Sequence, residues 1–406
     1  MAASAYRQLV TWWPVLLLGW TTIGAYGVAF YSFGVLIEPI HLDTGWSRGV
    51  LSAAFSVSAL AGAVGASIAG RSIDRFGGAP ALIGSTVLGG GLLYLAAEAE
   101  TPTIFLLTWG AGSGLVSAGA FYNVTMPMTA RRYPDRRPLA FSMLTFVGGF
   151  ASPIYFPLTA FFVDEWGWRV AIQLLGATLP LTVLPAAFLR RGGEGAASGS
   201  EDENEQASGY ASVREAYRSR RVLQMLAIFA LSGTAFTALQ VHQVPIMTAT
   251  GMTLAAAASA AGIRGLLSLP GRALLAVLVG RLGVLRALVS VQGAMALGIV
   301  ALLAAGPVAL IATYVLLTGL AFGTITPLNG LYAIEVYGER KMGTLLGVQR
   351  IVVGPAAAIG PILVGISADA NGSYAIGMAA MLATSVAAVL LLATMPPAAR
   401  NVAPEG

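Results

Sequence analysis

Twelve long apolar stretches constrain this chain more than any other feature of its sequence. Each approaches or exceeds the roughly 20 residues that a helix needs to cross the hydrocarbon core of a bilayer. Because backbone groups in lipid must be hydrogen-bonded within the segment, the pattern predicts an all-α membrane protein with twelve transmembrane helices. The expected spans are residues 13–37, 47–70, 79–97, 103–128, 138–162, 168–189, 221–248, 254–280, 285–304, 307–333, 342–367 and 374–395.

Composition supports a membrane protein and excludes several other classes. Charged residues make up only 10% of the 406 residues, whereas soluble domains contain about 25%. The sequence has no cysteine, and its only histidines are His41 and His242, which excludes disulfides, cysteine nucleophiles and histidine-rich metal centres. No nucleophile–base pair can be assembled within the apolar stretches, so we expect neither an enzyme nor a bound metal or cofactor.

The basic residues predict the orientation of the helices. If the N terminus is cytoplasmic, nearly all lysines and arginines fall on cytoplasmic segments, and the outside segments hold only Arg48 and Arg169. The positive-inside rule therefore predicts a multi-pass protein of the plasma membrane with both termini in the cytoplasm. The same asymmetry explains the net charge of +5, so a nucleic-acid partner is not expected. The first apolar stretch is long enough to span the bilayer, so we expect no cleavable signal peptide.

The chain is predicted to contain two similar halves. Three connections of the first half match connections of the second half at an offset of about 205 residues. The matched pairs are residues 73–77 with 279–283, 133–137 with 337–341, and 164–167 with 369–372. We therefore expect two pseudo-symmetric six-helix bundles, residues 1–190 and 221–406, with a site between them near the middle of the membrane. The polar segment 191–220 is expected to be a cytoplasmic linker.

Residues 70–78, GRSIDRFGG, resemble the signature between helices two and three of the major facilitator superfamily. In that family the Asp and Arg of the signature lock the cytoplasmic ends of the two bundles, which implies a gating role for Asp74 and Arg75. Charges next to helix ends can form such a lock, although the same charges also set the topology. The matching connection of the second half has Gly280 in place of the acid, so we expect a weaker lock there.

Within this superfamily the chain is similar to bacterial relatives of the monocarboxylate transporters. The resemblance rests on Gly45–Arg48, Tyr122–Asn123, Arg137–Ala140, Gly167–Arg169, Gly360–Pro361 and Gly372–Tyr374. It implies transport of small organic anions such as lactate or pyruvate by alternating access, coupled to protons. Thr11–Trp13 stands where animal members have an acidic-Gly-Gly-Trp motif, and Phe30–Phe33 lacks their helix-one lysine. Anion exchange or facilitated movement therefore fits the residues as well as proton symport does.

Three arginines lie inside the predicted helices, namely Arg264, Arg272 and Arg350, whereas all 18 acidic residues lie in connections or at helix ends. A guanidinium group in the membrane costs several kcal/mol unless it is paired or faces a water-filled cavity. Because no buried carboxylate is available to these arginines, we expect an anionic substrate to be the partner. The planar guanidinium fork suits a carboxylate, since it donates two parallel hydrogen bonds.

Arg272 is the main candidate for substrate binding, because it matches the helix-eight arginine that binds the substrate carboxylate in the family. Alternatively, it binds carbonyl groups freed by Pro270. His242 resembles the family's helix-seven histidine beside the substrate, or it is a structural, hydrogen-bonded histidine. Tyr122 and Asn123 would complete the site from the opposite bundle, or they pack between helices.

Arg350 is a second candidate cation. It lies one turn before Val353, the position at which the related oxalate–formate exchangers carry a second substrate-binding cation. It either contacts a second carboxylate or extends to the inner headgroups. Arg264 lies about 80° around its helix from Arg272, and we expect it in the outward vestibule. Three further residues either line the cavity or pack between helices: Phe146, Asn329 and Tyr332.

The sequence thus predicts a monomeric secondary transporter of small organic anions, favouring monocarboxylates, with the substrate, protons and the lipid bilayer as its partners. A dicarboxylate or oxalate-type anion exchanger is the main alternative. Drug efflux is a weaker alternative, because cavities for cationic drugs use buried acids. A sensor that binds an anion without carrying it is the alternative from a different class.

Overall fold

The structure, a computed structural model, describes residues 2–189, 213–304, 308–338 and 342–395, with the side chains of residues 2–11, 74 and 342–344 left out. Every regular element in these residues is a helix, as the apolar stretches predict. The predicted linker, residues 191–220, lies mostly within residues 190–212, which are outside the described residues, and its last part contains a short helix, Val213–Ala216. The assignment of residues 1–190, 191–220 and 221–406 to separate units therefore stays a prediction.

The first half of the chain crosses the molecule repeatedly as long, often interrupted helices. The first crossing consists of α1, a π-helical turn η1 and α2, and the third is interrupted in the same way by η2. The elements are α1 (Ala2–Tyr26), η1 (Gly27–Tyr31), α2 (Phe33–Thr44), α3 (Arg48–Phe76), α4 (Ala79–Gly84), η2 (Ser85–Gly89), α5 (Gly90–Ala97), α6 (Pro102–Ala120), α7 (Tyr122–Arg132), η3 (Pro134–Arg136), α8 (Arg137–Gly148), α9 (Ala151–Thr182) and α10 (Leu184–Ala187).

The second half repeats this organisation with fewer interruptions. A short helix, α11, precedes six crossings, of which only the α13–α14 crossing is broken. The elements are α11 (Val213–Ala216), α12 (Arg220–Ala249), α13 (Leu254–Leu266), α14 (Ser268–Leu282), α15 (Val284–Leu303), α16 (Val308–Tyr337), α17 (Met342–Asn371) and α18 (Ala375–Ala393).

The described residues contain 11 helical spans that are long and apolar enough to cross a membrane. One of them, residues 134–187, is 54 residues long, far longer than one crossing needs. It bends inside α9 at Gly167, whose φ of 77° and ψ of 167° are not helical. The span therefore crosses twice, which gives the twelve transmembrane helices predicted from the sequence.

Paired glycines confirm the internal repeat. Gly77 and Gly283 end matching helices with φ of 79° and 76°, and Gly167 and Gly372 make matching turns with φ of 77° and 63°. Residues with a Cβ rarely adopt this left-handed backbone, which explains glycine at these positions. The two halves therefore turn in the same way at corresponding points, as expected of two pseudo-symmetric bundles.

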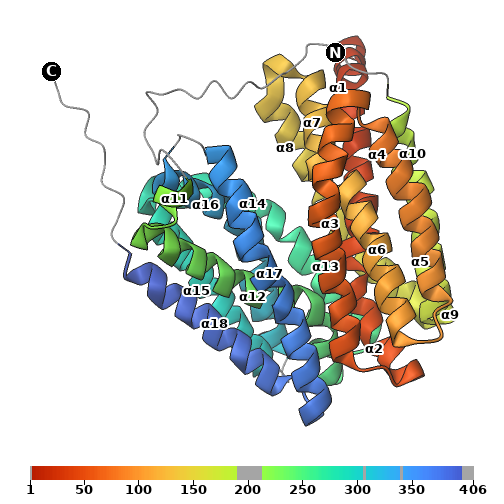
Figure 1. Cartoon of the computed structure of the whole chain (residues 1–406), viewed down its shortest axis with the longest axis vertical. Coiled ribbons are helices and arrows are strands. Elements are labelled where there is room, and N and C mark those ends of the chain that lie inside the picture. The colour runs from red at the N-terminus through yellow and green to blue at the C-terminus, as the bar shows by residue number, and fades with distance from the viewer. Residues whose placement is uncertain (1, 190–212, 305–307, 339–341, 396–406) are drawn as a thin grey trace.

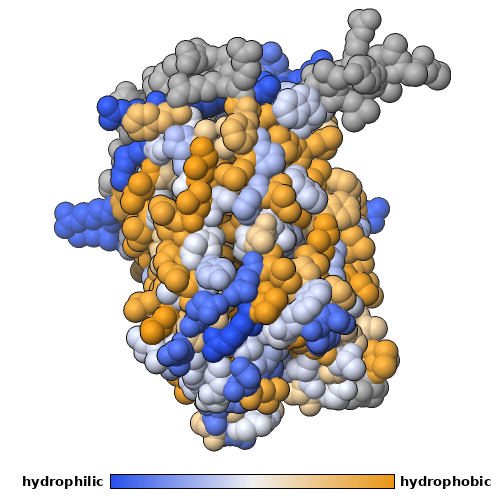
Figure 2. Space-filling model, turned by 90° about the vertical axis from the view of Figure 1, so that its right-hand side faces the viewer, coloured by the Kyte–Doolittle hydropathy of each residue, from blue (hydrophilic) through white to orange (hydrophobic). Residues whose placement is uncertain are grey.

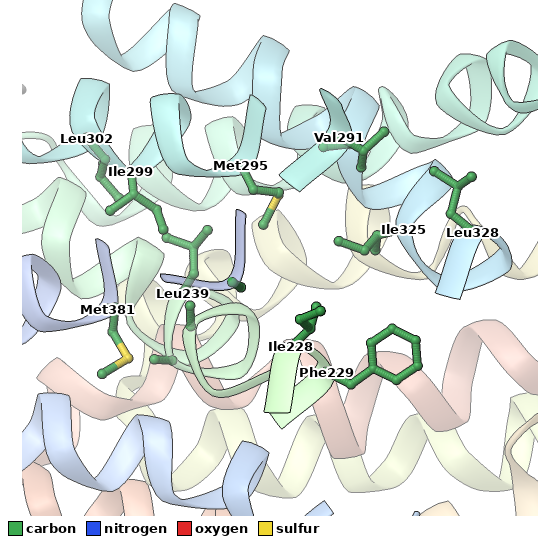
Figure 3. Close-up of a cluster of buried hydrophobic side chains, with 14 of the residues drawn as sticks. Ile228, Phe229, Leu239, Val291, Met295, Ile299, Leu302, Ile325, Leu328 and Met381 are labelled. Carbon is green, nitrogen blue, oxygen red and sulfur yellow. The ribbon is translucent and has the colours of Figure 1, made fainter. Parts of the chain in front are cut away.

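Each bundle has a hydrophobic core of its own. Figure 3 shows part of the second core, in which Leu239 of α12 lies near Ile299 and Met295 of α15. The face shown in Figure 2 is largely hydrophobic over its middle, and its hydrophilic residues lie mainly in the lower part and at the upper left of the view. Exposed apolar surface of this extent is what a membrane helix presents to lipid.

The two bundles meet at one end of the molecule and diverge toward the other (Figure 1). They touch where α3 packs on α17, α2 on α12, and α9 on α13. We call the end with the α2–α3 and α17–α18 turns the closed end, and the opposite end the open end. The hydrogen bonds between the bundles extend from Asp369 at the closed end to Ser56 and Thr145 farther in, within the part of the chain that the structure describes.

Candidate functional site

Arg272 lies where the two bundles separate. It belongs to α14, past the middle of the crossing formed by α13 and α14. Its Nη1 donates a hydrogen bond of 2.7 Å to the carbonyl oxygen of Thr145 in α8, and its guanidinium group is also hydrogen-bonded to the Tyr122 side chain at the start of α7. Both partners are neutral and both belong to the first bundle, so Arg272 reaches across the interface without meeting a counter-ion.

The acidic side chains are distributed as the sequence predicts. Within the described residues, the salt bridges join Arg48 to Glu38 and to Asp369 at the closed end. Arg272 forms none. A half-buried guanidinium group bonded only to a carbonyl and a hydroxyl keeps its full positive charge, which favours an anion at this place.

Aromatic residues of the first bundle form the wall beside Arg272. Tyr26 of α1 stacks on Phe121 with ring centroids 3.7 Å apart and lies 5.2 Å from the ring of Tyr122. Tyr31, in the π-helical turn, interacts electrostatically with both Tyr122 and Arg272. Sequence reasoning missed Tyr26, because nothing in its neighbourhood distinguishes it from the other aromatic residues of the spans.

Asn123 supports the break between α6 and α7. Its Nδ2 donates a hydrogen bond of 2.7 Å to the carbonyl oxygen of Ala118. Because the helix is interrupted here, this carbonyl oxygen would otherwise have no backbone donor. The break allows Tyr122, the first residue of α7, to face Arg272. Asn123 thus positions its neighbour, and its predicted contact with substrate remains a prediction.

Arg350 is exposed on α17 and acts electrostatically on Tyr26 across the interface. No hydrogen bond joins it to another described residue. Tyr26 contacts Tyr122, which in turn is bonded to Arg272. The structure therefore brings Arg350 and Arg272 to the same group of tyrosines, as a second-cation role would require.

Arg264 is placed differently from the expectation. The sequence predicts that Arg264 lies in the outward vestibule, but only 2% of its surface is exposed. Its Nε donates to Thr318 at 2.9 Å, and its Nη1 donates to the side-chain oxygens of Gln240 at 3.0 Å and Gln243 at 3.3 Å. The vestibule prediction is wrong, because two glutamines one helical turn apart on α12 draw the guanidinium group into the second bundle.

His242 lies in the packed part of the interface toward the closed end. It is completely buried, and its Nε2 donates to the carbonyl oxygen of Pro361 at 2.9 Å and lies 3.2 Å from Ser52 Oγ. Its ring is 5.4 Å from that of Tyr374. No described contact joins His242 to Arg272, so the structure places this histidine among groups that hold α12, α17 and α3 together.

The other predicted contacts are scattered. Tyr332 is only 1% exposed and lies in the core of the second bundle, 6.3 Å from the ring of Phe229, so it packs between helices and does not line the interface. Asn329 is half-buried, and its Oδ1 has no hydrogen bond within the described residues. Phe146 is 56% exposed and packs edge-on against Phe150 at 5.6 Å.

A latch that the sequence did not reveal joins the bundles at the closed end. The carboxylate of Asp369 accepts hydrogen bonds from the backbone N–H groups of Arg48, at 3.0 Å, and Gly49, at 2.9 Å, at the start of α3. Glu38 pairs with the Arg48 guanidinium group and accepts a hydrogen bond of 2.9 Å from the Tyr374 hydroxyl. Burial and the Glu38 carboxylate raise the pKa of Tyr374 well above its usual value. We call Glu38, Arg48, Asp369 and Tyr374 the latch of the closed end.

The structure describes only one side chain of the predicted lock at the open end. The side chain of Asp74 lies outside the described residues. Arg75 is exposed and lies over the ring of Phe76 at 5.3 Å, and no described contact joins it to the second bundle. The gating role of Asp74 and Arg75 stays a prediction.

Three curated relatives match part of the chain. An oxalate:formate antiporter from Oxalobacter formigenes is 24% identical over 40% of this chain and 38% of its own length. A gentisate transporter from Corynebacterium glutamicum is 27% identical over 43% and 39%. Monocarboxylate transporter 11 from Mus musculus is 29% identical over 41% and 35%. The chain thus covers less than two fifths of the length of each of these relatives.

Solved structures match nearly the whole chain. A mutant form of the nucleoside transporter NupG superposes with a TM-score of 0.80 at 12% identity, covering 94% of this chain and 99% of that one. A bacterial homologue of the human lysosomal transporter Spinster, in an inward-facing and unoccupied conformation, gives a TM-score of 0.73 at 14% identity, covering 96% of each chain. At these identities the likeness shows the fold alone.

The family comparison covers most of the chain. The model of the Major Facilitator Superfamily matches residues 19–361, which run from within the first crossing to within α17. The two bundles, their twelve crossings and the charged signature at the C-terminal end of α3 all agree with that match. The chain therefore belongs to the Major Facilitator Superfamily, whose members are membrane transporters rather than enzymes.

Proposed function

We propose that this transporter carries a small organic anion whose carboxylate binds Arg272. The observation that supports the proposal is the position of this guanidinium group. It extends from the second bundle to a carbonyl oxygen and a hydroxyl group of the first bundle, where the bundles begin to separate. Such a group can exchange its two neutral partners for a carboxylate, to which it donates two parallel hydrogen bonds.

Binding at Arg272 would couple the substrate to the movement of the bundles. Closing the open end around an unpaired guanidinium group would bury its charge, which costs several kcal/mol. A bound carboxylate neutralises that charge and lowers the cost. The loaded protein then passes more readily between its two open states, which is the requirement for alternating access.

Two observations favour a carboxylate as the anionic group. The names of the three relatives refer to oxalate and formate, gentisate, and monocarboxylates, all of which are carboxylates. Tyr26 and Tyr122 add hydroxyl groups and ring faces beside Arg272, which suit a small organic body better than an inorganic ion. Lactate and pyruvate are therefore the first substrates to test.

Exchange of dianions is the second candidate function. It is favoured by Arg350, which acts on Tyr26 from α17 while Arg272 is bonded to the neighbouring Tyr122. Two cations on either side of one tyrosine pair could hold the two carboxylates of a molecule such as oxalate. In that case Arg350→Gln would abolish transport of dianions and spare that of monoanions.

We also propose an orientation and a mode of coupling. Arg131 and Arg281 lie toward the open end, whereas Arg48 and Arg169 lie toward the closed end, so the positive-inside rule assigns the open end to the cytoplasm. Since His242 is enclosed away from Arg272, a transported proton would travel on the substrate acid, or the anion would be exchanged without one.

Transport into proteoliposomes tests the proposal. Uptake of radiolabelled lactate, pyruvate and oxalate is measured with and without a pH gradient, and by counterflow. Arg272→Gln should abolish uptake, whereas Arg281→Gln, which removes an exposed charge from the same helix, should leave it unchanged. Uptake by Arg272→Gln at the wild-type rate would refute the site. Ligand-induced stabilisation of the wild-type protein without any flux would instead favour a sensor.

A further inference from the structure

Arg264 leaves part of its hydrogen-bonding capacity unused. Its Nε and Nη1 are bonded, but its Nη2 has no hydrogen-bond partner, although this atom is sealed from solvent. The side chain of Gln240 also has an unused donor. Its Oε1 accepts a hydrogen bond of 3.0 Å from Arg264, but its Nε2 has no hydrogen-bond partner. Two buried donors in directly bonded side chains are therefore free together, within the described residues.

Among the residues that the structure describes, those bonded to Arg264 carry no negative charge. Its hydrogen-bond partners are the neutral side chains of Thr318, Gln240 and Gln243, and the hydroxyl of Tyr314 donates to Gln243 as well. Buried charges in proteins are normally compensated by an opposite charge. Arg264 is deeply buried, yet its described hydrogen-bond partners are all neutral. The burial of this guanidinium group therefore indicates that an anion compensates its charge.

The two free donors are sealed from solvent and lie within the second bundle. Arg264 lies in α13, and its partners lie in α12 and α16. The backbone of α16 approaches closely at Gly319, where a Cβ would meet the Arg264 carbonyl oxygen at 2.7 Å. The ring of Phe322 lies 5.3 Å from the guanidinium carbon. Because all these groups belong to one bundle, the enclosure would move as a unit during alternating access.

We propose that Arg264 Nη2 and Gln240 Nε2 bind a small inorganic anion, a halide such as chloride, that resides in the second bundle. An anion accepts from both free donors and also compensates the guanidinium charge, whereas a water molecule would do only the first. A halide fits better than the carboxylate of the cargo, because both donor atoms are sealed in this conformation while Arg272 stands at the separation of the bundles. The proposal stands independently of what Arg272 binds.

Thermal unfolding of the purified full-length protein in detergent tests this site. Potassium chloride or bromide replaces potassium gluconate at constant ionic strength and pH. A ligand that binds the folded state raises its stability, so the wild-type midpoint should rise saturably with halide by about 2 °C or more. Bromide should also give an anomalous scattering peak beside Arg264 Nη2 in crystals.

Two substitutions localise the effect. Gln240→Glu places a carboxylate at the position of the amide that accepts from Arg264, so the midpoint in gluconate should rise and the halide dependence should disappear. Arg272→Gln should lose transport yet keep the halide dependence in full. If Arg264→Gln folds, it should be insensitive to halide, and Gln240→Glu provides the test if it does not fold.

Three results would overturn the proposal. One is a wild-type midpoint that does not respond to halide. Another is a halide response that survives in Gln240→Glu and vanishes in Arg272→Gln, which would place the anion at Arg272. The third is stabilisation by lactate or oxalate that Gln240→Glu removes, which would assign the Arg264 site to the transported molecule.

Discussion

Replacing Asp369 by asparagine should open the closed end. The Asp369 carboxylate of α17 accepts hydrogen bonds from the backbone N–H groups of Arg48 and Gly49, at 3.0 and 2.9 Å, across the two bundles. Asparagine has the same shape but only one acceptor oxygen and no charge. Because the bonded groups belong to different bundles, the loss destabilises only the conformation in which the closed end is shut.

The size of this effect follows from the contacts. A hydrogen bond to a charged group contributes about 1.5–3 kcal/mol, and an anion at a helix N-terminus adds about 0.3–1 kcal/mol. The Asp369 side chain is 24% exposed, and its 3.7 Å contact with Arg48 Nη1 adds little at such exposure. We take about 2 kcal/mol for the substitution, or roughly a 30-fold change in the ratio of the two states. If about one wild-type molecule in a hundred is open at this end, the substitution would raise that fraction to about one in four.

Spin-label distances measure this shift directly. The chain has no cysteine, so Leu42→Cys and Ile376→Cys, both at exposed positions of the closed end, provide the only labelled pair. Asp369→Asn should add a population of longer distances, and Asp164→Asn, which removes an exposed acid near the α9 bend, should not. A distance distribution in Asp369→Asn that matches the wild type would refute the latch.

Three further predictions concern single residues. Tyr374→Phe should lower the thermal midpoint through loss of the hydrogen bond to Glu38. Because the pKa of Tyr374 is raised in the folded state, the stability contributed by this bond is complete below about pH 10 and is lost only as the pH rises through the folded-state pKa. The difference in midpoint from the wild type should therefore be constant between about pH 7 and pH 9. Gly323→Ala should destabilise the protein or abolish its expression, because a Cβ there would collide with a carbonyl oxygen of α14, whereas Gly330→Ala, with open space around it, should have little effect; size-exclusion profiles and midpoints distinguish the two. His242→Gln should lower the midpoint yet leave the pH dependence of lactate uptake unchanged, and a lost pH dependence would contradict the structural role given to this histidine.

The fold could be predicted almost completely from the sequence, because apolar length and the position of charged residues are local properties. The twelve crossings follow from span length, and the matched turns at Gly167 and Gly372 follow from repeated loop sequences. The double crossing through α9 follows from length alone, because its apolar stretch is more than twice as long as one crossing needs.

The site could be predicted only in part. The sequence shows that Arg264 and Arg272 lack a nearby acid, but not which neutral groups meet each of them. Gln240 and Gln243 lie three residues apart on one face of α12, a signal from which the enclosure of Arg264 could have been suspected. The hydrogen bond between Asp369 and the start of α3 joins residues 321 positions apart in the sequence. No local sequence pattern predicts such a pairing.

Uptake by Arg272 variants is the most direct measurement of the central claim, that this guanidinium group binds the transported carboxylate. Initial rates of lactate, pyruvate and oxalate uptake are compared in proteoliposomes containing equal amounts of wild type, Arg272→Lys and Arg272→Gln. A retained charge without the bidentate fork should give a raised KM with Arg272→Lys, and Arg272→Gln should reduce kcat/KM at least about 100-fold for each transported anion. Wild-type kinetics in Arg272→Gln, in protein whose thermal midpoint shows it to be folded, would contradict the account.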